Sequence, residues 1–186
     1  MGMASPASWT AEMVRALPDD GNRYEVVDGR LLVTPSPSRL HQHAVGEIFA
    51  TLYAYLQRVG AGVVLASPAD IELDEHGLVQ PDVFVEALIN GRRATHWNEG
   101  APLLLVVEVA SPSTARDDRI TKRRRYQRAG IPEYWIVDPD ARTIERWRPG
   151  EDRPEVLADS LRWLPTPDSE PLAIDLEALF AGIHGD

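Results

Sequence analysis

The fold is set by residues 103–139, LLLVVEVASPSTARDDRITKRRRYQRAGIPEYWIVDP. This stretch predicts a buried strand, a polar loop, a long basic helix and a second buried strand. The apolar run at residues 103–109 is typical of a core strand covered on both faces, yet it contains Glu108 near its end. Because a buried carboxylate is costly unless it is paired, hydrogen-bonded or bound to a metal, Glu108 is the first candidate functional residue.

The second candidate is Lys122, the only lysine in a chain that contains eighteen arginines. Its compact ammonium differs chemically from a planar guanidinium, so the exception is informative. Seven basic and two acidic residues lie within residues 116–128, although the whole chain has a net charge of -10. Such a basic helix fits either phosphate contact or a solvated surface, and composition alone favours neither.

Length and composition predict one domain over residues 1–186, with a core at about residues 23–148 and an irregular tail at residues 149–186. The chain has no cysteine, which excludes disulfides, thiolate zinc sites and cysteine nucleophiles. No stretch has the length of a membrane span, and the N-terminal residues lack the apolar core of a signal peptide. We therefore expect a cytoplasmic protein without a membrane partner.

The segments before the central stretch follow ordinary local signals. Residues 10–17 predict a short helix with Thr10 as N-cap. Residues 23–35, RYEVVDGRLLVTP, predict a hairpin around Asp28 and Gly29, with Glu25 on its first strand. Apolar residues at helical spacing predict an amphipathic helix over residues 41–56, on which His43 and Glu47 share a face.

Residues 78–86, LVQPDVFVE, predict one strand whose period of two places Asp82 opposite the valines. Pro81 cannot donate to a sheet ladder, so it marks a strand start, an edge or a bulge. Residues 90–100 predict a loop, and residues 133–147 predict a hairpin. The proline-rich tail predicts mostly irregular chain that closes with a short helix at residues 176–181.

Asp82, Glu108 and Lys122 together suggest a phosphodiester site. Two carboxylates at neighbouring strand ends can hold Mg²⁺ or Mn²⁺, which prefer oxygen ligands. The ion would polarise the scissile phosphate and activate water, and a nearby lysine can stabilise the developing negative charge.

These motifs resemble the PD-(D/E)XK nuclease superfamily, and more closely the Uma family of restriction-endonuclease-like proteins. The resemblance rests on YEVVDGRLL, the helix from His41, QPDVFVE, LLLVVEVASPST, DDRITKRRRYQRAG and IPEYWIVDP. It implies an α/β (α+β) fold with a restriction-endonuclease-like core, in which helices flank a central mixed sheet and an N-terminal hairpin is added. It also implies that Asp82 and Glu108 bind the metal.

The superfamily lysine usually stands two residues after the strand acid, where this chain has Ala110. The resemblance to the Uma family implies that the lysine has moved to the next helix, as Lys122. Asp118, Lys122 and Tyr126 recur every four residues and share one helix face, so Tyr126 is a supporting candidate. The family resemblance also suggests Glu25 and His43 as supporting polar residues.

Each of these residues also has a structural explanation. Glu108 could form an ion pair with Arg125, and a Pro-Asp dipeptide is a common strand start. His43 fits an ordinary helix histidine, and Glu25 fits an exposed hairpin carboxylate.

The leading expectation is a Mg²⁺- or Mn²⁺-dependent endonuclease that acts on DNA. Arg123, Arg124, Arg125 and Arg128 are expected to contact the nucleic-acid backbone. The alternative is a non-catalytic binding or assembly module with a nuclease-like fold. The net charge of -10 and the absence of the strand lysine favour this alternative. A homodimer is expected by analogy with related nucleases.

Overall fold

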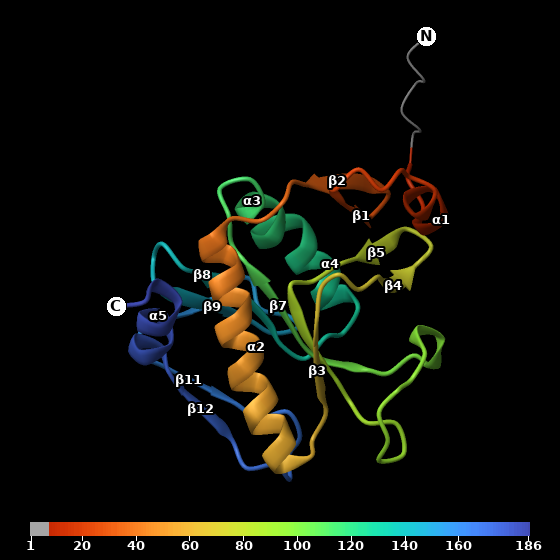
Figure 1. Ribbon diagram of the computed structural model, residues 1–186. Helices are drawn as coiled ribbons and strands as arrows, with labels where there is room; N and C mark the ends of the chain where they lie inside the picture. Colours follow the sequence, from red (N-terminus) through yellow and green to blue (C-terminus); the bar gives the residue numbers. More distant parts are fainter. Residues whose placement is uncertain (1–7) are drawn as a thin grey trace. The chain divides into compact units, whose positions relative to one another are not determined.

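A computed structural model, drawn in Figure 1, describes residues 8–186. Its contacts divide the chain into two compact units. Unit 1 contains the chain up to Ser36 together with Pro68–Gln80, and unit 2 contains Pro37–Ser67 and Pro81–Asp186. The sequence predicted a single domain because no change of composition marks this division. Within residues 8–186, no helix combines the length and the apolar character that a membrane crossing requires.

Unit 1 is a four-stranded antiparallel sheet with one short helix. The sheet has the order β2-β1-β5-β4, and its hairpin turns at Asp28 (φ 52°) and Gly29 (φ 75°). This positive-φ pair is the tight turn that the sequence predicts. Thr10 caps the helix as expected by accepting a hydrogen bond from the Met13 amide at 3.3 Å. The elements are α1 (Ala11–Arg15), β1 (Arg23–Val27), β2 (Arg30–Thr34), β4 (Ile71–Asp74) and β5 (Gly77–Val79).

Unit 2 is built on a six-stranded mixed sheet of order β10-β9-β8-β7-β6-β3. The β7 and β8 strands run parallel, while the other neighbours are antiparallel. A parallel pair needs a crossover connection, and the basic helical segment supplies it. The strands are β3 (Val63–Ala66), β6 (Val83–Glu86), β7 (Leu103–Val109), β8 (Tyr134–Asp138), β9 (Thr143–Trp147) and β10 (Glu155–Leu157).

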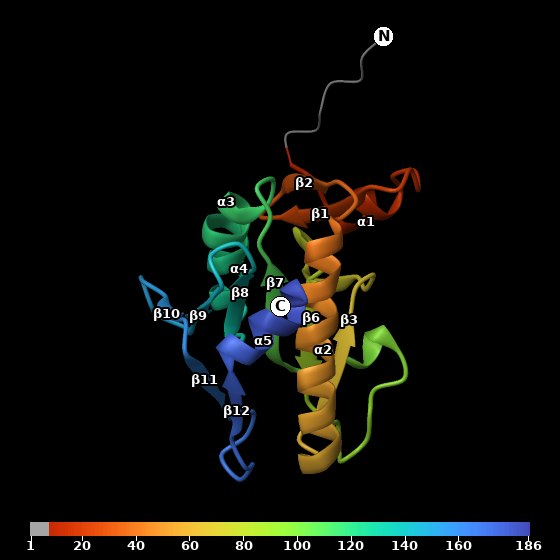
Figure 2. The ribbon, with the colours of Figure 1, turned by 60° about the vertical axis from the view of Figure 1, so that its left-hand side comes forward.

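Helices cover both faces of this sheet (Figures 1 and 2). On one face lie α2 (Arg39–Val59) and α5 (Leu176–His184), which pack on alternate residues of the sheet such as Val107 and Val109. On the other face lies the helical segment between β7 and β8. The predicted α/β (α+β) architecture, with helices that flank a central mixed sheet and with an N-terminal hairpin, is therefore confirmed.

The predicted strand over residues 78–86 was wrong. Its two halves are β5 and β6, which belong to different sheets and to different units. Pro81 has no amide hydrogen for a ladder, and the chain leaves one sheet and enters the other at this point. Ser67 holds the turn within unit 2, because its hydroxyl donates to the Pro81 carbonyl at 2.7 Å and its amide donates to the Asp82 carbonyl at 3.1 Å.

The expectation of a mostly irregular tail was also wrong. Besides β10, the tail forms the hairpin of β11 (Ser160–Trp163) and β12 (Leu172–Asp175), and then α5. Trp163 is buried and packs edge-on against Trp135 with ring centroids 5.9 Å apart. The tail therefore completes the core of unit 2.

Candidate active site

Glu108 lies on β7 and is 1% exposed. Its neighbours Val107 and Val109 face α2, so alternation along the strand turns Glu108 toward the helical segment on the other face. Its Oε1 atom accepts hydrogen bonds from the Lys122 Nζ at 3.0 Å and from the Tyr126 hydroxyl at 2.9 Å. Two of the predicted residues, Lys122 and Tyr126, thus meet the predicted carboxylate directly.

Lys122 comes from a helical segment with an unusual middle turn. The segment consists of α3 (Ala115–Asp117), the π-helical turn η2 (Asp118–Lys122) and α4 (Arg123–Arg128). A π turn adds a residue to the helical repeat and is frequent at functional sites. Lys122 ends this turn and is 2% exposed, so its ammonium is enclosed beside Glu108.

Asp118 is a member of the cluster that the sequence did not single out as a site residue. Its Oδ1 lies 3.6 Å from the Lys122 Nζ, and its side chain is 1% exposed. The Tyr134 hydroxyl donates to the Asp118 carbonyl at 3.2 Å, which ties the π turn to β8. The four-residue spacing from Lys122 was the signal that pointed to it.

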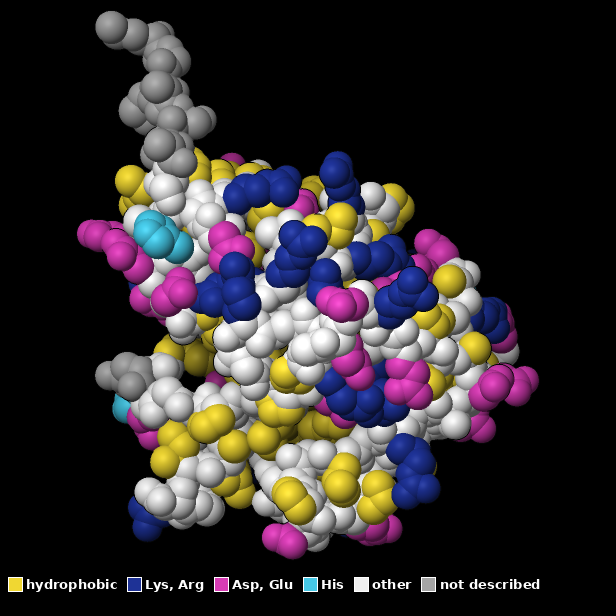
Figure 3. Space-filling model, turned by 180° about the vertical axis from the view of Figure 1, so that it is seen from behind, with side chains coloured by type: hydrophobic (Ala, Val, Ile, Leu, Met, Phe, Trp, Pro, Cys, Tyr) yellow, Lys and Arg dark blue, Asp and Glu magenta, His cyan; other side chains and the backbone are white. Residues whose placement is uncertain are grey.

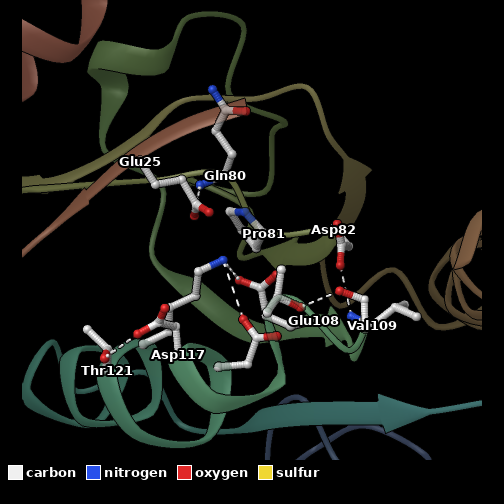
Figure 4. A network of polar contacts seen from close by, with 12 residues as sticks. Glu25, Gln80, Pro81, Asp82, Glu108, Val109, Asp117 and Thr121 are labelled. Atoms are coloured by element: carbon white, nitrogen blue, oxygen red, sulfur yellow. Dashed lines mark hydrogen bonds and ion pairs between the residues drawn. The ribbon is translucent and has the colours of Figure 1, made fainter. Parts of the chain in front are cut away.

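Asp82 follows Pro81 directly before β6 and is 3% exposed. Its Oδ2 accepts a hydrogen bond from the Val109 amide at 2.8 Å, next to Glu108 on β7 (Figure 4). The β6–β7 register pairs Val83 with Val107, so Asp82 and Glu108 are the next residues along the two neighbouring strands. The two predicted metal ligands therefore belong to one corner of the sheet.

A histidine of α2 contacts this aspartate. The His41 Nε2 lies 3.2 Å from the Asp82 Oδ2, and the His41 side chain is 10% exposed. Ser38 caps α2 by accepting a hydrogen bond from the His41 amide at 3.2 Å, which fixes the first turn of the helix. His43, the predicted supporting histidine, is exposed, and the structure does not bring it to the cluster.

Glu25 belongs to unit 1, where it is buried on β1. Its Oε1 accepts a hydrogen bond from the Gln80 amide at 2.9 Å (Figure 4). The expectation that Glu25 is an exposed hairpin carboxylate was therefore wrong. Its role as a supporting residue stays a prediction.

The four arginines predicted to contact nucleic acid have different surroundings. Arg124 and Arg128 are exposed, whereas Arg125 is 7% exposed. Arg123 lies over the Trp147 ring at 4.7 Å and donates to the Arg119 carbonyl and the Gln127 side chain. Figure 3 shows that the Lys and Arg side chains on the side opposite α2 are interspersed with Asp and Glu.

The donor set suits a hard divalent cation. Asp82 and Glu108 offer buried carboxylate oxygens, the ligand type that Mg²⁺ and Mn²⁺ prefer. Among residues 8–186, no three His, Asp or Glu side chains are grouped to hold a metal by themselves. Mg²⁺ commonly uses one or two carboxylates and keeps several waters, so a pair of carboxylates still fits this ion.

Two comparisons find similar proteins. The sequence matches the family Uma2, described as "Putative restriction endonuclease", over residues 11–178. A crystal structure of "a putative nuclease belonging to DUF820" from Anabaena variabilis ATCC 29413 is similar, with a TM-score of 0.74 and 18% sequence identity. The match covers 94% of this chain and 99% of that one. No curated protein matches the sequence.

Proposed function

The chain belongs to the Uma2 family of restriction-endonuclease-like proteins, and on that premise we propose that it is a divalent-metal-dependent endonuclease that hydrolyses phosphodiester bonds in DNA. Asp82 and Glu108 would hold the metal, and Lys122 would be the catalytic cation. The family description supports DNA as the substrate, because restriction enzymes act on DNA.

One observation carries the assignment of the residues. Two carboxylates and an ammonium, which come from different elements, lie near the end of β7. Lys122 donates to Glu108 at 3.0 Å, and Asp82 accepts from the amide of Val109, the next residue. Carboxylates on neighbouring strands and a nearby ammonium are the groups that phosphodiester hydrolysis requires.

The chain's own residues would keep these groups oriented. Tyr126 donates to the same oxygen of Glu108 as Lys122 does, which restricts rotation of the carboxylate. The Val109 amide and His41 both contact the Asp82 Oδ2, which fixes the second carboxylate. Burial of all three charged groups lowers the local dielectric constant and strengthens their interactions with a phosphate.

A bound Mg²⁺ or Mn²⁺ would supply Lewis-acid polarisation of the phosphate and activation of water. The Lys122 ammonium would stabilise the negative charge that develops on the phosphate. The exposed Arg124 and Arg128 on α4 would contact the DNA backbone without reading its sequence.

Cleavage of a supercoiled plasmid tests the proposal. We expect wild-type protein to cleave it with Mg²⁺ or Mn²⁺ and not in EDTA. Asp82→Asn keeps the shape of the side chain and an oxygen acceptor for the Val109 amide, but removes the negative charge. It should lower the cleavage rate by about a hundredfold or more. The exposed Asp168→Asn in the same unit is the matched control and should leave the rate unchanged.

Cleavage that persists in EDTA, or wild-type activity in folded Asp82→Asn protein, would contradict the proposal. Absence of both cleavage and metal uptake in the wild-type protein would favour the non-catalytic module instead. Circular dichroism of each variant separates a lost site from a lost fold.

A further inference from the structure

Trp97 is the most exposed tryptophan among the residues that the structure describes, at 61% exposure. It lies in the connection between β6 and β7, within residues 90–100, which we call the Trp97 loop. Tryptophan is enriched at binding interfaces, because its ring supplies a large apolar contact area and a polar N–H group. The site residues described above do not include it.

The Trp97 loop is ordered by its own hydrogen bonds. Its first part turns at Asn90 (φ 52°) and Gly91 (φ 75°), and Ile89 and Arg92 exchange backbone hydrogen bonds of 2.9 and 3.0 Å. Its second part contains the 3₁₀ turn η1 (Trp97–Glu99). There the Glu99 Oε1 accepts hydrogen bonds from the Thr95 amide at 2.8 Å, the Thr95 hydroxyl at 2.9 Å and the His96 amide at 2.8 Å.

The charges of this loop favour an anionic partner. Arg92 and Arg93 are exposed, and the only acidic residue in residues 90–100 is Glu99, whose carboxylate is engaged by Thr95 and His96. The loop is thus locally basic in a chain with a net charge of -10. An exposed aromatic ring beside arginines is the combination that binds single-stranded nucleic acids, where bases stack on the ring and arginines contact phosphates.

The loop lies on the same face of the sheet as the candidate active site. The Trp97 ring contacts the ring of Phe84, with centroids 6.4 Å apart. Phe84 pairs with Val106 in the β6–β7 register, and Glu108 is two residues further along β7 on the same face. Two residues of a β-strand span about 7 Å. A bound single-stranded nucleic acid of several nucleotides could therefore reach both the Trp97 loop and Glu108.

From these observations we propose that the Trp97 loop is a binding site for single-stranded nucleic acid, in which Trp97 stacks on an unpaired base and Arg92 and Arg93 contact phosphates. The inference rests on the proposed function, since it names the substrate-binding surface of the same enzyme. It assigns a preference for a single strand or for a locally unpaired duplex, because a base inside a helix offers no free face.

Binding of a fluorescein-labelled 16-mer of deoxythymidine, measured by anisotropy in EDTA, tests the stacking contact without cleavage. We expect Trp97→Ala and Trp97→Leu to raise Kd about tenfold, whereas Trp97→Phe keeps most of the affinity. Trp97→Leu retains an apolar contact to Phe84, so it separates loss of the aromatic ring from loss of packing. Tyr53→Ala is the matched control, because Tyr53 is a 49% exposed aromatic residue on α2, on the other face of the sheet.

The salt dependence tests the arginines separately. The double variant Arg92→Gln/Arg93→Gln should reduce the slope of log Kd against log salt by about 1.4, since each phosphate contact on a single strand contributes about 0.7. Trp97→Ala should leave this slope unchanged. Arg153→Gln, at another exposed arginine of unit 2, should also leave the slope unchanged.

Several results would overturn the inference. These are undetectable binding of the oligonucleotide, wild-type affinity in folded Trp97→Leu protein, or an equal loss in Tyr53→Ala. Binding through Trp97 without any metal-dependent cleavage would leave this inference standing and contradict the proposed function. Plasmid cleavage with unchanged binding by Trp97→Ala would contradict this inference alone.

Discussion

Lys122 illustrates how a single residue type can point to a site. It is the one lysine of the chain, and the structure encloses its ammonium between Glu108 and Asp118, at 3.0 and 3.6 Å. Arginine would bring a larger, planar group with five donors into this space. The choice of residue and the geometry are therefore consistent, although the lysine comes from a helix and not from the strand.

Removal of this ammonium should destabilise the protein. Lys122→Met keeps a similar side-chain length but leaves two buried carboxylates without their shared cation, and such a loss typically costs about 3–5 kcal/mol. Urea unfolding at neutral pH measures the change in the free energy of unfolding. The double variant Lys122→Met/Glu108→Gln should lose less stability than Lys122→Met alone, because one of the two buried negative charges is removed.

Arg124→Met is the matched control, since Arg124 is exposed two residues further along the same helical segment. It should change the stability by no more than about 0.5 kcal/mol. A Lys122→Met variant as stable as this control would show that the buried ion pair does not stabilise the fold.

His41 contacts Asp82, whereas the sequence analysis named His43, two residues further along the same helix. The buried positions of α2, such as Ala44, Ile48 and Leu52, define the face that packs on the sheet. His41 is seven residues before Ile48, or two helical turns, so it lies on that face, whereas His43 is displaced from it. The helical spacing of the apolar residues thus indicated that His41, and not His43, lies on the face that packs on the sheet. The family resemblance, which matched residue type alone, did not use this spacing.

At the scale of the element, Glu99 holds the second part of the Trp97 loop through its hydrogen bonds to Thr95 and His96. Hydrogen bonds from the Thr95 amide and hydroxyl and from the His96 amide lower the pKa of the Glu99 carboxyl below its usual value of 4.5. A lowered pKa in the folded state means that the stabilisation is complete above pH 4.5 and is lost as the pH falls through the lower, folded-state pKa.

We therefore expect the turn around Thr95 and His96 to open at acidic pH before the core does. Hydrogen exchange of the Thr95 and His96 amides, corrected for the intrinsic pH dependence, should show loss of protection below pH 4.5. Glu99→Gln should show the weaker protection at all pH values. Equal protection of the two amides in wild-type and Glu99→Gln protein would contradict this role.

The elements were predictable where local signals decide them. The Asp28-Gly29 hairpin, the Thr10 cap and the long amphipathic α2 all follow from short-range preferences. The π turn at Asp118–Lys122 was not predictable, because the sequence of a π turn resembles that of an α-helix. The tail was misread because Pro165, Pro167 and Pro171 mark the connection between β11 and β12 and do not interrupt the strands.

At the scale of the whole molecule, the division into two units was hidden in one apparently continuous strand. Periodicity over residues 78–86 is the same whether the chain stays in one sheet or changes sheets at Pro81. Which sheet each half joins is decided by its partner strands, which lie far along the chain. The alternation of apolar and polar residues does not identify those partner strands. The candidate site was predicted from residue types and from the family resemblance, and its three residues, Asp82, Glu108 and Lys122, all belong to unit 2.

The central claim is that Asp82 and Glu108 form a metal site beside Lys122. A crystal structure of the wild-type protein with Mn²⁺, recorded at a wavelength where manganese scatters anomalously, tests it most directly. We predict an anomalous peak for a manganese ion within bonding distance of a carboxylate oxygen of Asp82 and a carboxylate oxygen of Glu108. Crystals of Asp82→Asn should lack this peak. A manganese ion bound elsewhere, with no peak between these two carboxylates, would contradict the account.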